Sequence, residues 1–348
     1  MVDIVQRLSS QPGTAKFDAK DRKILALLSE DGRMPASDIA KKVLLSRDAV
    51  AYRVKRLQDQ GAFISVVPII DLERLGFQTY RVFMLLDEKA RSKHASLIST
   101  LKTHPHTKSV MQYTDTWDVE WNMVARSNFE FDKLMTDLLT KFPDVILEKE
   151  QLAVVKRYLS IQVPRFYWGA KTNPISTIKG KPFSMPDVDK KDMAILLALC
   201  KDARQSSYEI AKSLKVSPDT VVYRMKNMID SGIIRQFSPL LELSRLGLSW
   251  YTYAVNFRKF DARDESKLKE FVRAHPNIIY AAKMFGAWDV TMTIVSDSPK
   301  GYHDSVKAVK NEFADIIYNY QTWLAYEELF FTPLPAVVSG SVGDPSAG

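Results

Sequence analysis

The distribution of apolar positions predicts one well-defined helix over residues 46–61. Val50, Val54 and Leu57 recur at the spacing of a single helix face, while the other faces are polar or basic. The stretch begins with a serine, which favours the N-cap, and ends with a glycine, which favours the position after the last turn. The same pattern returns over residues 217–232. The chain therefore contains two related helices of this kind.

These two helices belong to a long internal repeat. Gly61 and Gly232 are 171 positions apart, and Trp117 and Trp288 have the same separation. The repeat continues without a gap from about residue 21 to about residue 155 of the first copy. A period of this length indicates a tandem duplication of a two-domain unit rather than an array of short repeats.

The first part of each unit predicts a helix-turn-helix. Residues 18–28 and 35–42 have helical patterns in front of the helix at 46–61. The second copy has the corresponding segments at 192–199 and 207–213. Short helices joined by a tight turn, the last one basic on its outer face, are typical of this motif.

The second part of each unit predicts helices packed on one face of a sheet. The expected order is β-α-β-β-α-β, which is that of a ferredoxin-like domain in an α+β fold. Because large aromatic residues such as Trp117 and Trp121 disfavour an exposed sheet face, we expect the two copies to pack together as an intrachain pseudo-dimer. In the first copy the expected strands are 79–86, 107–113, 117–125 and 146–155, the expected helices are 91–103 and 128–142, and an apolar strand at 63–70 leads into them.

These patterns divide the chain into six segments. Each copy consists of a winged or plain helix-turn-helix domain followed by a ferredoxin-like domain, with a proline-rich linker between the copies and a disordered tail at the end. Part of the linker is expected to pack down through Phe166, Tyr167 and Trp168. The expected boundaries are 18–62 and 63–158 for the first copy, 159–187 for the linker, 188–233 and 234–333 for the second copy, and 334–348 for the tail.

Composition and charge restrict the class of protein. The chain has 348 residues, a formal net charge of +8 and a pI of about 9.2, which favours an acidic partner such as double-stranded DNA. The single cysteine, Cys200, excludes a disulfide framework and fits a reducing compartment. No apolar run has the length of a membrane span, and the N-terminal residues lack the pattern of a signal peptide. We therefore expect a cytoplasmic protein without a membrane partner.

The order of these motifs resembles that of the Lrp/AsnC transcription regulators. The resemblance rests on the helix S-R-D-A-V-A-Y-R-V-K-R-L-Q-D-Q-G, a strand linker, a Leu-Gly step, a helix ending in His-Pro, and a Gly-x-x-Asp hairpin that is intact in the second copy as G-A-W-D. It covers residues 18–158 and 188–332. The resemblance implies a sequence-specific DNA-binding regulator that responds to an amino acid or a similar small effector. It also implies pairing through the ferredoxin-like domains and a homo-oligomer.

The predicted recognition helices supply the candidate DNA contacts. Residues near the start of such a helix reach base edges, and basic residues bind phosphates. Arg47 is suited to guanine and Ala51 to a thymine methyl group, but the second copy has Pro218 and Val222 at these positions. We therefore expect the first copy to read sequence more strongly and the operator to be an imperfect palindrome. The candidate residues are Arg47, Asp48, Ala51, Tyr52, Arg53, Lys55, Arg56, Asp219, Val222, Tyr223, Arg224 and Lys226.

The hairpins of the ferredoxin-like domains are the candidate effector sites, as the resemblance implies. Gly286 is replaced by Asp115 in the first copy, which weakens the expectation for that hairpin. A tight hairpin held by a core tryptophan explains the same residues equally well. The candidate effector residues are Met284, Gly286, Trp288, Asp289, Asp115, Trp117 and Asp118.

An enzyme is the second class of function to consider. The five histidines show no paired spacing for a metal, and the chain has no glycine-rich phosphate loop or nucleophile motif. We therefore expect no catalytic residue, metal or cofactor. Siroheme decarboxylases of tetrapyrrole synthesis resemble this architecture and are the alternative, together with a ligand-binding protein of reduced DNA affinity. The segment 113–122 lacks the histidine and arginine that a resemblance to those enzymes implies, which disfavours the enzyme.

Overall fold

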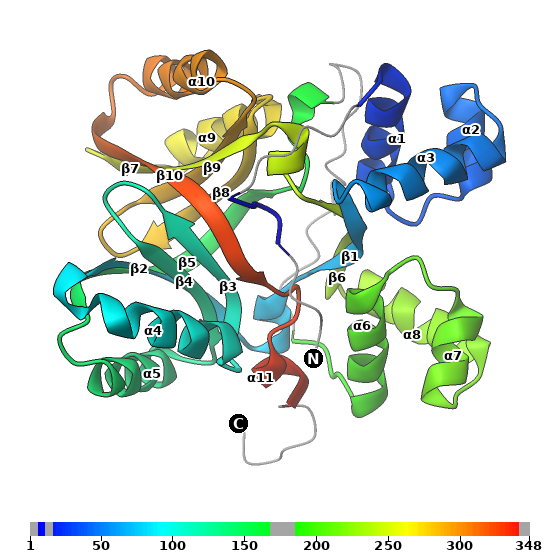
Figure 1. Cartoon of the computed structure of the whole chain (residues 1–348), viewed down its shortest axis with the longest axis horizontal. Coiled ribbons are helices and arrows are strands. Elements are labelled where there is room, and N and C mark those ends of the chain that lie inside the picture. Colours follow the sequence, from blue (N-terminus) through cyan, green and yellow to red (C-terminus); the bar gives the residue numbers. More distant parts are fainter. Residues whose placement is uncertain (1–5, 11–16, 168–184, 341–348) are drawn as a thin grey trace.

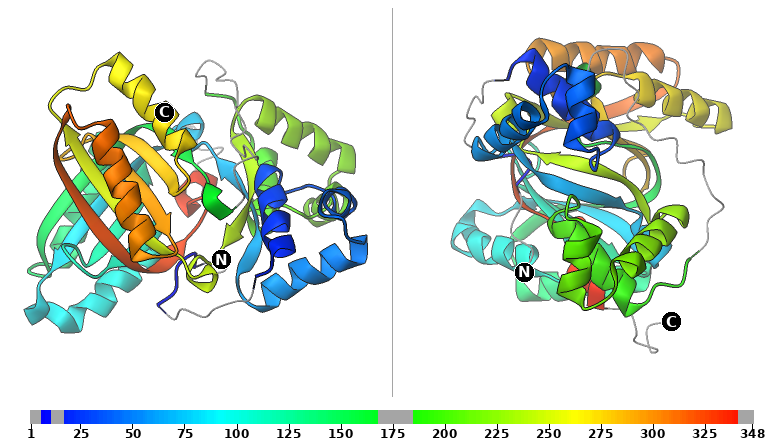
Figure 2. Two further views of the ribbon diagram at one scale, coloured as in Figure 1. Left: turned by 90° about the horizontal axis from the view of Figure 1, so that it is seen from above. Right: turned by 90° about the vertical axis from the view of Figure 1, so that its right-hand side faces the viewer.

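The computed structural model describes residues 6–10, 17–167 and 185–340. Its architecture consists of a barrel of β-strands with helices on its outside, and two small helical domains next to each other beyond one side of the barrel (Figure 1). A two-stranded ribbon lies between the barrel and the helical domains (Figure 2). The two copies seen in the sequence thus share one barrel and one ribbon, to which each copy contributes strands.

Each helical domain is a bundle of three helices. Acidic capping boxes begin the first helix of each bundle: the Asp18 side chain accepts from the backbone N–H of Asp21, and the Asp189 side chain does so from that of Asp192. Ser46 caps the third helix of the first bundle, as its sequence predicts. The helices are α1 (Ala19–Glu30), α2 (Ala36–Val43) and α3 (Arg47–Asp59), then α6 (Lys190–Lys201), α7 (Ser207–Leu214) and α8 (Pro218–Asp230).

The barrel contains eight antiparallel strands, four from each copy. Their order is β10-β3-β4-β2-β5-β8-β9-β7, and β7 closes the barrel onto β10. The strands β5 and β10 are long because each pairs first within its own copy and then with the other copy, at β8 and β3. The strands are β2 (Gln78–Leu86), β3 (Thr107–Tyr113), β4 (Val119–Ala125), β5 (Ile146–Ser160), β7 (Ser249–Phe257), β8 (Ile278–Phe285), β9 (Val290–Ser296) and β10 (Ile317–Phe331).

Four helices cover the outside of the barrel, and one face of each strand packs against them. In the first copy Val82, Trp121 and Leu97 belong to one buried cluster between the sheet and its two helices. This arrangement confirms the β-α-β-β-α-β order and the α+β fold class predicted from periodicity. The helices are α4 (Arg91–Thr103) and α5 (Asn128–Lys141) in the first copy, and α9 (Ala262–Ala274) and α10 (Pro299–Glu312) in the second.

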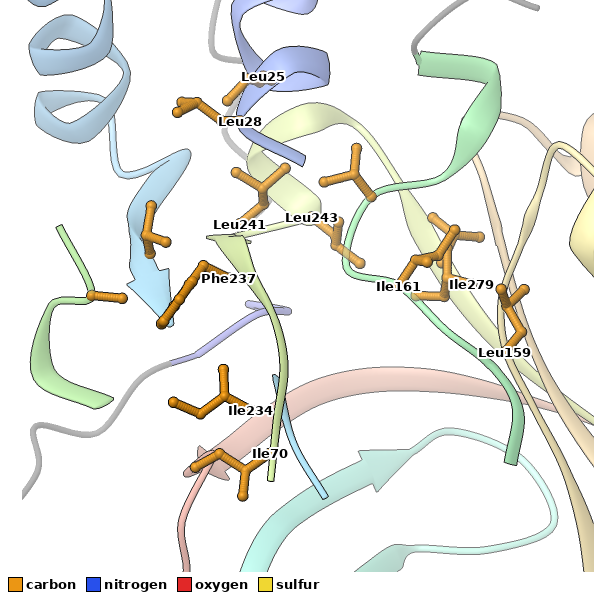
Figure 3. Close-up of a cluster of buried hydrophobic side chains, with 14 of the residues drawn as sticks. Leu25, Leu28, Ile70, Leu159, Ile161, Ile234, Phe237, Leu241, Leu243 and Ile279 are labelled. Atoms are coloured by element: carbon orange, nitrogen blue, oxygen red, sulfur yellow. The ribbon is translucent and has the colours of Figure 1, made fainter. Parts of the chain in front are cut away.

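The ribbon joins the two copies between the barrel and the helical domains. It consists of β1 (Phe63–Ile70) paired antiparallel with β6 (Ile234–Leu241), so the strand expected at 63–70 forms no part of the eight-stranded barrel. The helical domains pack across it, since α1 contacts β6 and α6 contacts β1. Figure 3 shows Leu25 and Leu28 of α1 next to Leu241 of β6. Each helical domain is therefore held by the strand of the other copy.

The C-terminal tail and the linker each contain an ordered segment. The prediction of a disordered tail from residue 334 is wrong for residues 334–340, because α11 (Ala336–Gly340) is helical and Val338 is buried. Phe166 packs against the main core, as expected, through a short turn at Arg165–Tyr167, but Trp168 lies outside the described residues. The short elements are η1 (Leu72–Leu75), η2 (Glu88–Ala90), η3 (Arg165–Tyr167) and η4 (Ser244–Leu246).

Candidate nucleic-acid interface and internal cavity

The helix α3 presents a polar and basic outer face. Val50 and Leu57 are buried, as the apolar stripe predicts, and the opposite side of the helix is open to solvent. Tyr52 is 68% exposed, and Tyr223 at the equivalent position of the second copy is 66% exposed. The exposed candidates on this helix are Arg47, Asp48, Ala51, Tyr52 and Lys55.

Two arginines of α3 are engaged inside the domain. Arg53 Nη1 lies 2.7 Å from a carboxylate oxygen of Asp18 and 2.9 Å from one of Asp21, and Arg56 also pairs with Asp21. Asp21 is fully buried, so these contacts tie α3 to the start of α1. The Asp21 backbone N–H, together with Arg53, lowers the pKa of Asp18 to about 2. The structure thus places Arg53 and Arg56 where they hold α3 against α1.

The helix α8 repeats this arrangement with one arginine instead of two. Arg224 Nη1 lies 2.8 Å from Asp189 and 2.9 Å from Asp192, but Asn227 stands where the first copy has Arg56. The other candidates on this helix, Asp219, Val222, Tyr223 and Lys226, are exposed. The outer face of α8 is therefore accessible as well, but it carries fewer positive charges.

Reciprocal contacts across the ribbon set the relative position of the two domains. The Gly32 N–H donates to the carbonyl of Phe237 at 3.0 Å, and the Ala203 N–H donates to that of Val66 at 2.8 Å. A methyl group on Gly32 would lie 2.5 Å from a side-chain carbon of Val66, so the loop approaches β1 as closely as it can. In addition, Arg204 Nη1 donates to the Gly32 carbonyl at 3.1 Å. Equivalent loops of the two domains are thus each bound to the ribbon strand of the other copy.

The hairpins proposed as effector sites lie at the contact between the two halves of the barrel. Trp117, Trp288 and Met284 are buried in one cluster with Trp323 of β10. A side chain at Gly286, whose φ is +142°, would lie 2.5 Å from the backbone of β5 in the other copy. The aspartates of the hairpins accept backbone N–H groups: Asp115 that of Leu324, Asp118 that of Leu86, and Asp289 that of Phe257.

The interior of the barrel contains a charged network. Arg81 Nε and Nη2 donate to the two carboxylate oxygens of Glu120 at 2.6 and 3.0 Å, and Tyr113 donates to the same carboxylate at 2.8 Å. The second copy contributes two hydroxyl groups: Thr291 accepts from Arg81, and Thr252 bonds to Tyr113. Burial lowers the pKa of Arg81, but Glu120 outweighs this effect, so the guanidinium stays charged.

This network is asymmetric with respect to the duplication. Thr252 and Thr291 occupy the positions in the second copy that correspond to Arg81 and Glu120 in the first. Two copies of one unit would bring two arginines and two glutamates into one closed interior, where like charges repel and desolvation is costly. A covalent duplication allows one half to supply the ion pair and the other half to supply neutral partners.

A cavity of about 120 Å³ lies between the barrel interior and the ribbon. Its walls combine cationic side chains with apolar ones from both copies. Burial, and then Arg157 and Arg7, lower the pKa of Lys108 to about 7, which Glu73 and Asp71 oppose only in part. The residues that line the cavity include Arg7, Arg81, Lys108, Glu120, Asn122, Arg157, Ile70, Ile161, Ile279 and Phe331.

The N-terminal residues help to close this cavity, which the sequence did not indicate. Leu8 is buried in the barrel cluster with Trp323, and Arg7 Nε donates to Glu328 at 2.8 Å. Lys108 and Asn122 were also not singled out from the sequence. The alternation of polar residues along 118–122 was a usable signal, since Glu120 and Asn122 share the strand face that the barrel encloses.

Local structure accounts for three of the five histidines. His104 and His275 each follow the last residue of a helix, and burial lowers the pKa of both to about 4. His106 is buried, and its Nδ1 lies 2.8 Å from the carbonyl oxygen of Val124. Within the described residues no group of three histidine, cysteine, aspartate or glutamate side chains is placed to hold a metal ion. No described helix is long and apolar enough to cross a membrane.

Comparison with known protein families identifies the helical domains. Residues 17–58 match the AsnC-type helix-turn-helix domain, and residues 188–235 match a winged helix-turn-helix DNA-binding domain. Over these domains the chain is similar to transcription regulators of the Lrp/AsnC type. Its two copies of the unit make it a tandem duplication, as the internal repeat predicted.

Similar curated proteins are transcription regulators of about half this size. The chain is 28% identical over 129 residues to the HTH-type transcriptional regulator FL11 of Pyrococcus horikoshii, which covers 37% of this chain and 83% of that protein. It is 27% identical over 143 residues to the regulatory protein AsnC of Haemophilus influenzae, covering 41% and 94%. A third relative is the Bkd operon transcriptional regulator of Pseudomonas aeruginosa, with 29% identity over 141 residues, covering 40% and 92%.

A solved structure with the same architecture over its full length is that of an enzyme. The siroheme decarboxylase NirDL, in complex with an iron-uroporphyrin III analogue, aligns with 91% of this chain and 94% of its own at a TM-score of 0.60. The sequence identity is 12%, so the likeness concerns the fold. A shared fold does not fix a function, so the side chains of the site must decide it.

Proposed function

We propose that this protein is a sequence-specific DNA-binding transcription regulator in which α3 and α8 contact one duplex. The supporting observation is a pair of helices with open polar faces on two matched helix-turn-helix domains. The ribbon and the reciprocal loop contacts hold the two domains at a set distance. A rigid pair of recognition helices suits two half-sites on one side of the DNA.

The two half-sites are proposed to be unequal. Arg53, Arg56 and Arg224 hold their helices in place through ion pairs, so the difference in base reading rests on the exposed residues at the helix starts. There the first copy has Arg47, a residue suited to guanine, and the second has Pro218, which carries no donor. We therefore expect an imperfect palindrome whose stronger half binds α3.

DNase I footprinting and gel shifts over a salt series test this proposal. Arg47→Ala should weaken specific binding by about 1–3 kcal/mol and relax the sequence preference in one half-site only. Lys93→Ala, which removes an exposed positive charge on α4 far from the helical domains, is the matched control and should change nothing. Equal protection of both halves of a perfect inverted repeat would contradict the proposal that α3 and α8 bind unequal half-sites. Weak binding without sequence preference would contradict the regulator itself.

The effector is part of the same proposal. The second hairpin offers an exposed surface for a small molecule, because Phe285 next to Gly286 is 76% exposed. The first hairpin has its Asp115 carboxylate engaged by the Leu324 N–H at 2.8 Å. If an effector binds at a hairpin, we expect the second copy to be the site. Trp288→Phe would report on it through a changed fluorescence response to added amino acids.

Binding rather than catalysis is proposed for the barrel interior. A drug-sized ligand occupies a pocket of about 300–1,000 Å³, and a tetrapyrrole is at least of that size. The internal cavity, about 120 Å³, is smaller than this. Incubation of the protein with siroheme under reducing, anaerobic conditions provides the direct test. Release of carbon dioxide would support the enzyme instead of the regulator.

A further inference from the structure

Lys108 places an amine in a cationic part of the internal cavity. It lies on β3 next to Ser109, which is opposite Asn122 of β4, and it lines the cavity with both of them. Burial, and then Arg157 and Arg7, lower the pKa of Lys108 to about 7. At pH 7.5 about three quarters of such amines are neutral, compared with about 0.1% of an ordinary exposed lysine. Lys108 is therefore able to act as a nucleophile at neutral pH.

The carboxylates around this cavity are held by arginine side chains. Glu73 accepts from Arg157 Nη2 at 3.1 Å, and Glu120 accepts from Arg81 Nε at 2.6 Å. Other pairs of the same region are Asp71 with Arg157 and Arg235, and Glu328 with Arg7. Because positive charges that disfavour an ammonium group favour an anion at the same place, a negatively charged form of the Lys108 side chain would be stabilised here.

We propose that Lys108 is a modification site for carbon dioxide, which adds to the amine and forms a carbamate. The nitrogen lone pair forms the N–C bond, one C=O electron pair moves onto oxygen, and the proton leaves to solvent. No oxidant, reductant or further reactant is required. The product carries one negative charge, which Arg157 and Arg7 attract, whereas they repel the ammonium form. The site is proposed independently of DNA binding.

The size and polarity of the cavity fit this product. The cavity of about 120 Å³ exceeds what carbon dioxide needs, since a cavity of about 150 Å³ accommodates the larger benzene. The carbamate keeps one N–H donor, and the buried Oδ1 of Asn122 has no hydrogen-bond partner among the described residues. Part of the wall is apolar and includes Ile161 and Ile279, which lie next to each other in Figure 3 and suit an uncharged gas.

The duplication makes this a single site. At the position that corresponds to Lys108 the second copy has Ile279, and at that of Arg157 it has Glu328. The second copy thus repeats neither the amine nor the cation that would stabilise its carbamate. We therefore expect one modified lysine per chain.

Chemical trapping on the intact protein without DNA tests the proposal. The protein is equilibrated with isotopically labelled carbon dioxide at pH 7.5, carbamates are converted to ethyl esters with triethyloxonium, and the labelled peptides are identified by mass spectrometry. Lys108 should be labelled at least tenfold more than any other lysine, because its neutral fraction is larger. The α-amino group, with an ordinary pKa of about 8, is the internal reference for the trapping reaction. Labelling of the α-amino group without Lys108, or equal labelling of Lys108 and exposed lysines, would overturn the proposal.

Stability provides a second readout. The carbamate of Lys108 forms in the native state, where the amine is neutral, so carbon dioxide at constant pH and ionic strength should raise the Tm of the unsubstituted protein. Lys108→Met, which keeps the length of the side chain, should lose this rise, and Lys149→Met, at an exposed lysine on β5, should keep it. A rise of the same size in Lys108→Met would contradict the assignment. If Lys108→Met fails to fold, the trapping result on the unsubstituted protein decides.

The pH dependence follows from the same amine. At equal dissolved carbon dioxide, labelling of Lys108 should fall at least tenfold between pH 7.5 and pH 6, because the amine becomes an ammonium group below its pKa of about 7. Labelling that is unchanged over this range would contradict a reaction at the neutral amine. The charged and titratable groups facing Lys108 are Arg7, Asp71, Glu73 and Arg157, with Arg81, Glu120 and Tyr280 also in the cavity wall.

Discussion

The ion pair inside the barrel provides a quantitative test of how the two copies complement each other. Replacing Arg81 by threonine, the residue at the equivalent position of the second copy, leaves the carboxylate of Glu120 buried without its cation. Breaking a buried pair by removing one partner costs about 3–5 kcal/mol. Tyr113 still donates to the carboxylate at 2.8 Å, so we expect the lower end of that range.

The double variant Arg81→Thr/Glu120→Thr provides the control. It gives the first copy the same threonines as the second and removes both charges together, so its loss of stability should be smaller than that of Arg81→Thr alone. Guanidinium unfolding followed by tryptophan fluorescence measures both changes, and the double-mutant cycle isolates the coupling of the pair. If Arg81→Thr lowered the free energy of unfolding by less than about 1 kcal/mol, the reasoning would be refuted, because that is the contribution of a solvent-exposed ion pair. Additive losses would refute it as well.

Three further outcomes are expected. Gly32→Ala should lower the free energy of unfolding by about 1–3 kcal/mol because the methyl group would lie 2.5 Å from a β1 side chain, while Ala203→Gly should cost about 1 kcal/mol or less; equal effects in urea titrations would contradict this. Burial lowers the pKa of His104 and His275 to about 4, below the ordinary 6.5, so the unfolded state binds protons first and the free energy of unfolding should fall as the pH drops from 6.5 to 4. In a His104→Gln/His275→Gln variant the free energy of unfolding should depend less on pH over this range. An unchanged pH dependence would contradict the argument from burial. Cys200 is buried, and burial raises the pKa of its thiol, so a thiol reagent should label it only on unfolding; fast labelling of the native protein would show that α6 opens locally.

The periodic positions of the chain were enough to predict most elements of the fold. Helix and strand periods depend on local geometry, so the stripe Val50, Val54 and Leu57 predicted α3, and the order of the segments after Gly61 predicted the ferredoxin-like domains. Hydrogen-bonding caps are local as well, which is why Ser46 could be assigned from the sequence. The duplication was visible because its register contains no gap.

The meaning of the polar positions depended on the tertiary structure. The alternation over residues 118–122 showed that Glu120 and Asn122 share a strand face, but only barrel closure by the second copy turns that face into an interior. Likewise, Arg53 was available for DNA until the fold placed Asp18 and Asp21 next to it. A sequence period states which residues lie together on an element. The contacts of a helix or strand face are decided by pairing between segments that lie far apart in the chain. Depending on that pairing, the same residue faces solvent, an opposite charge or a cavity, and its role differs in each case.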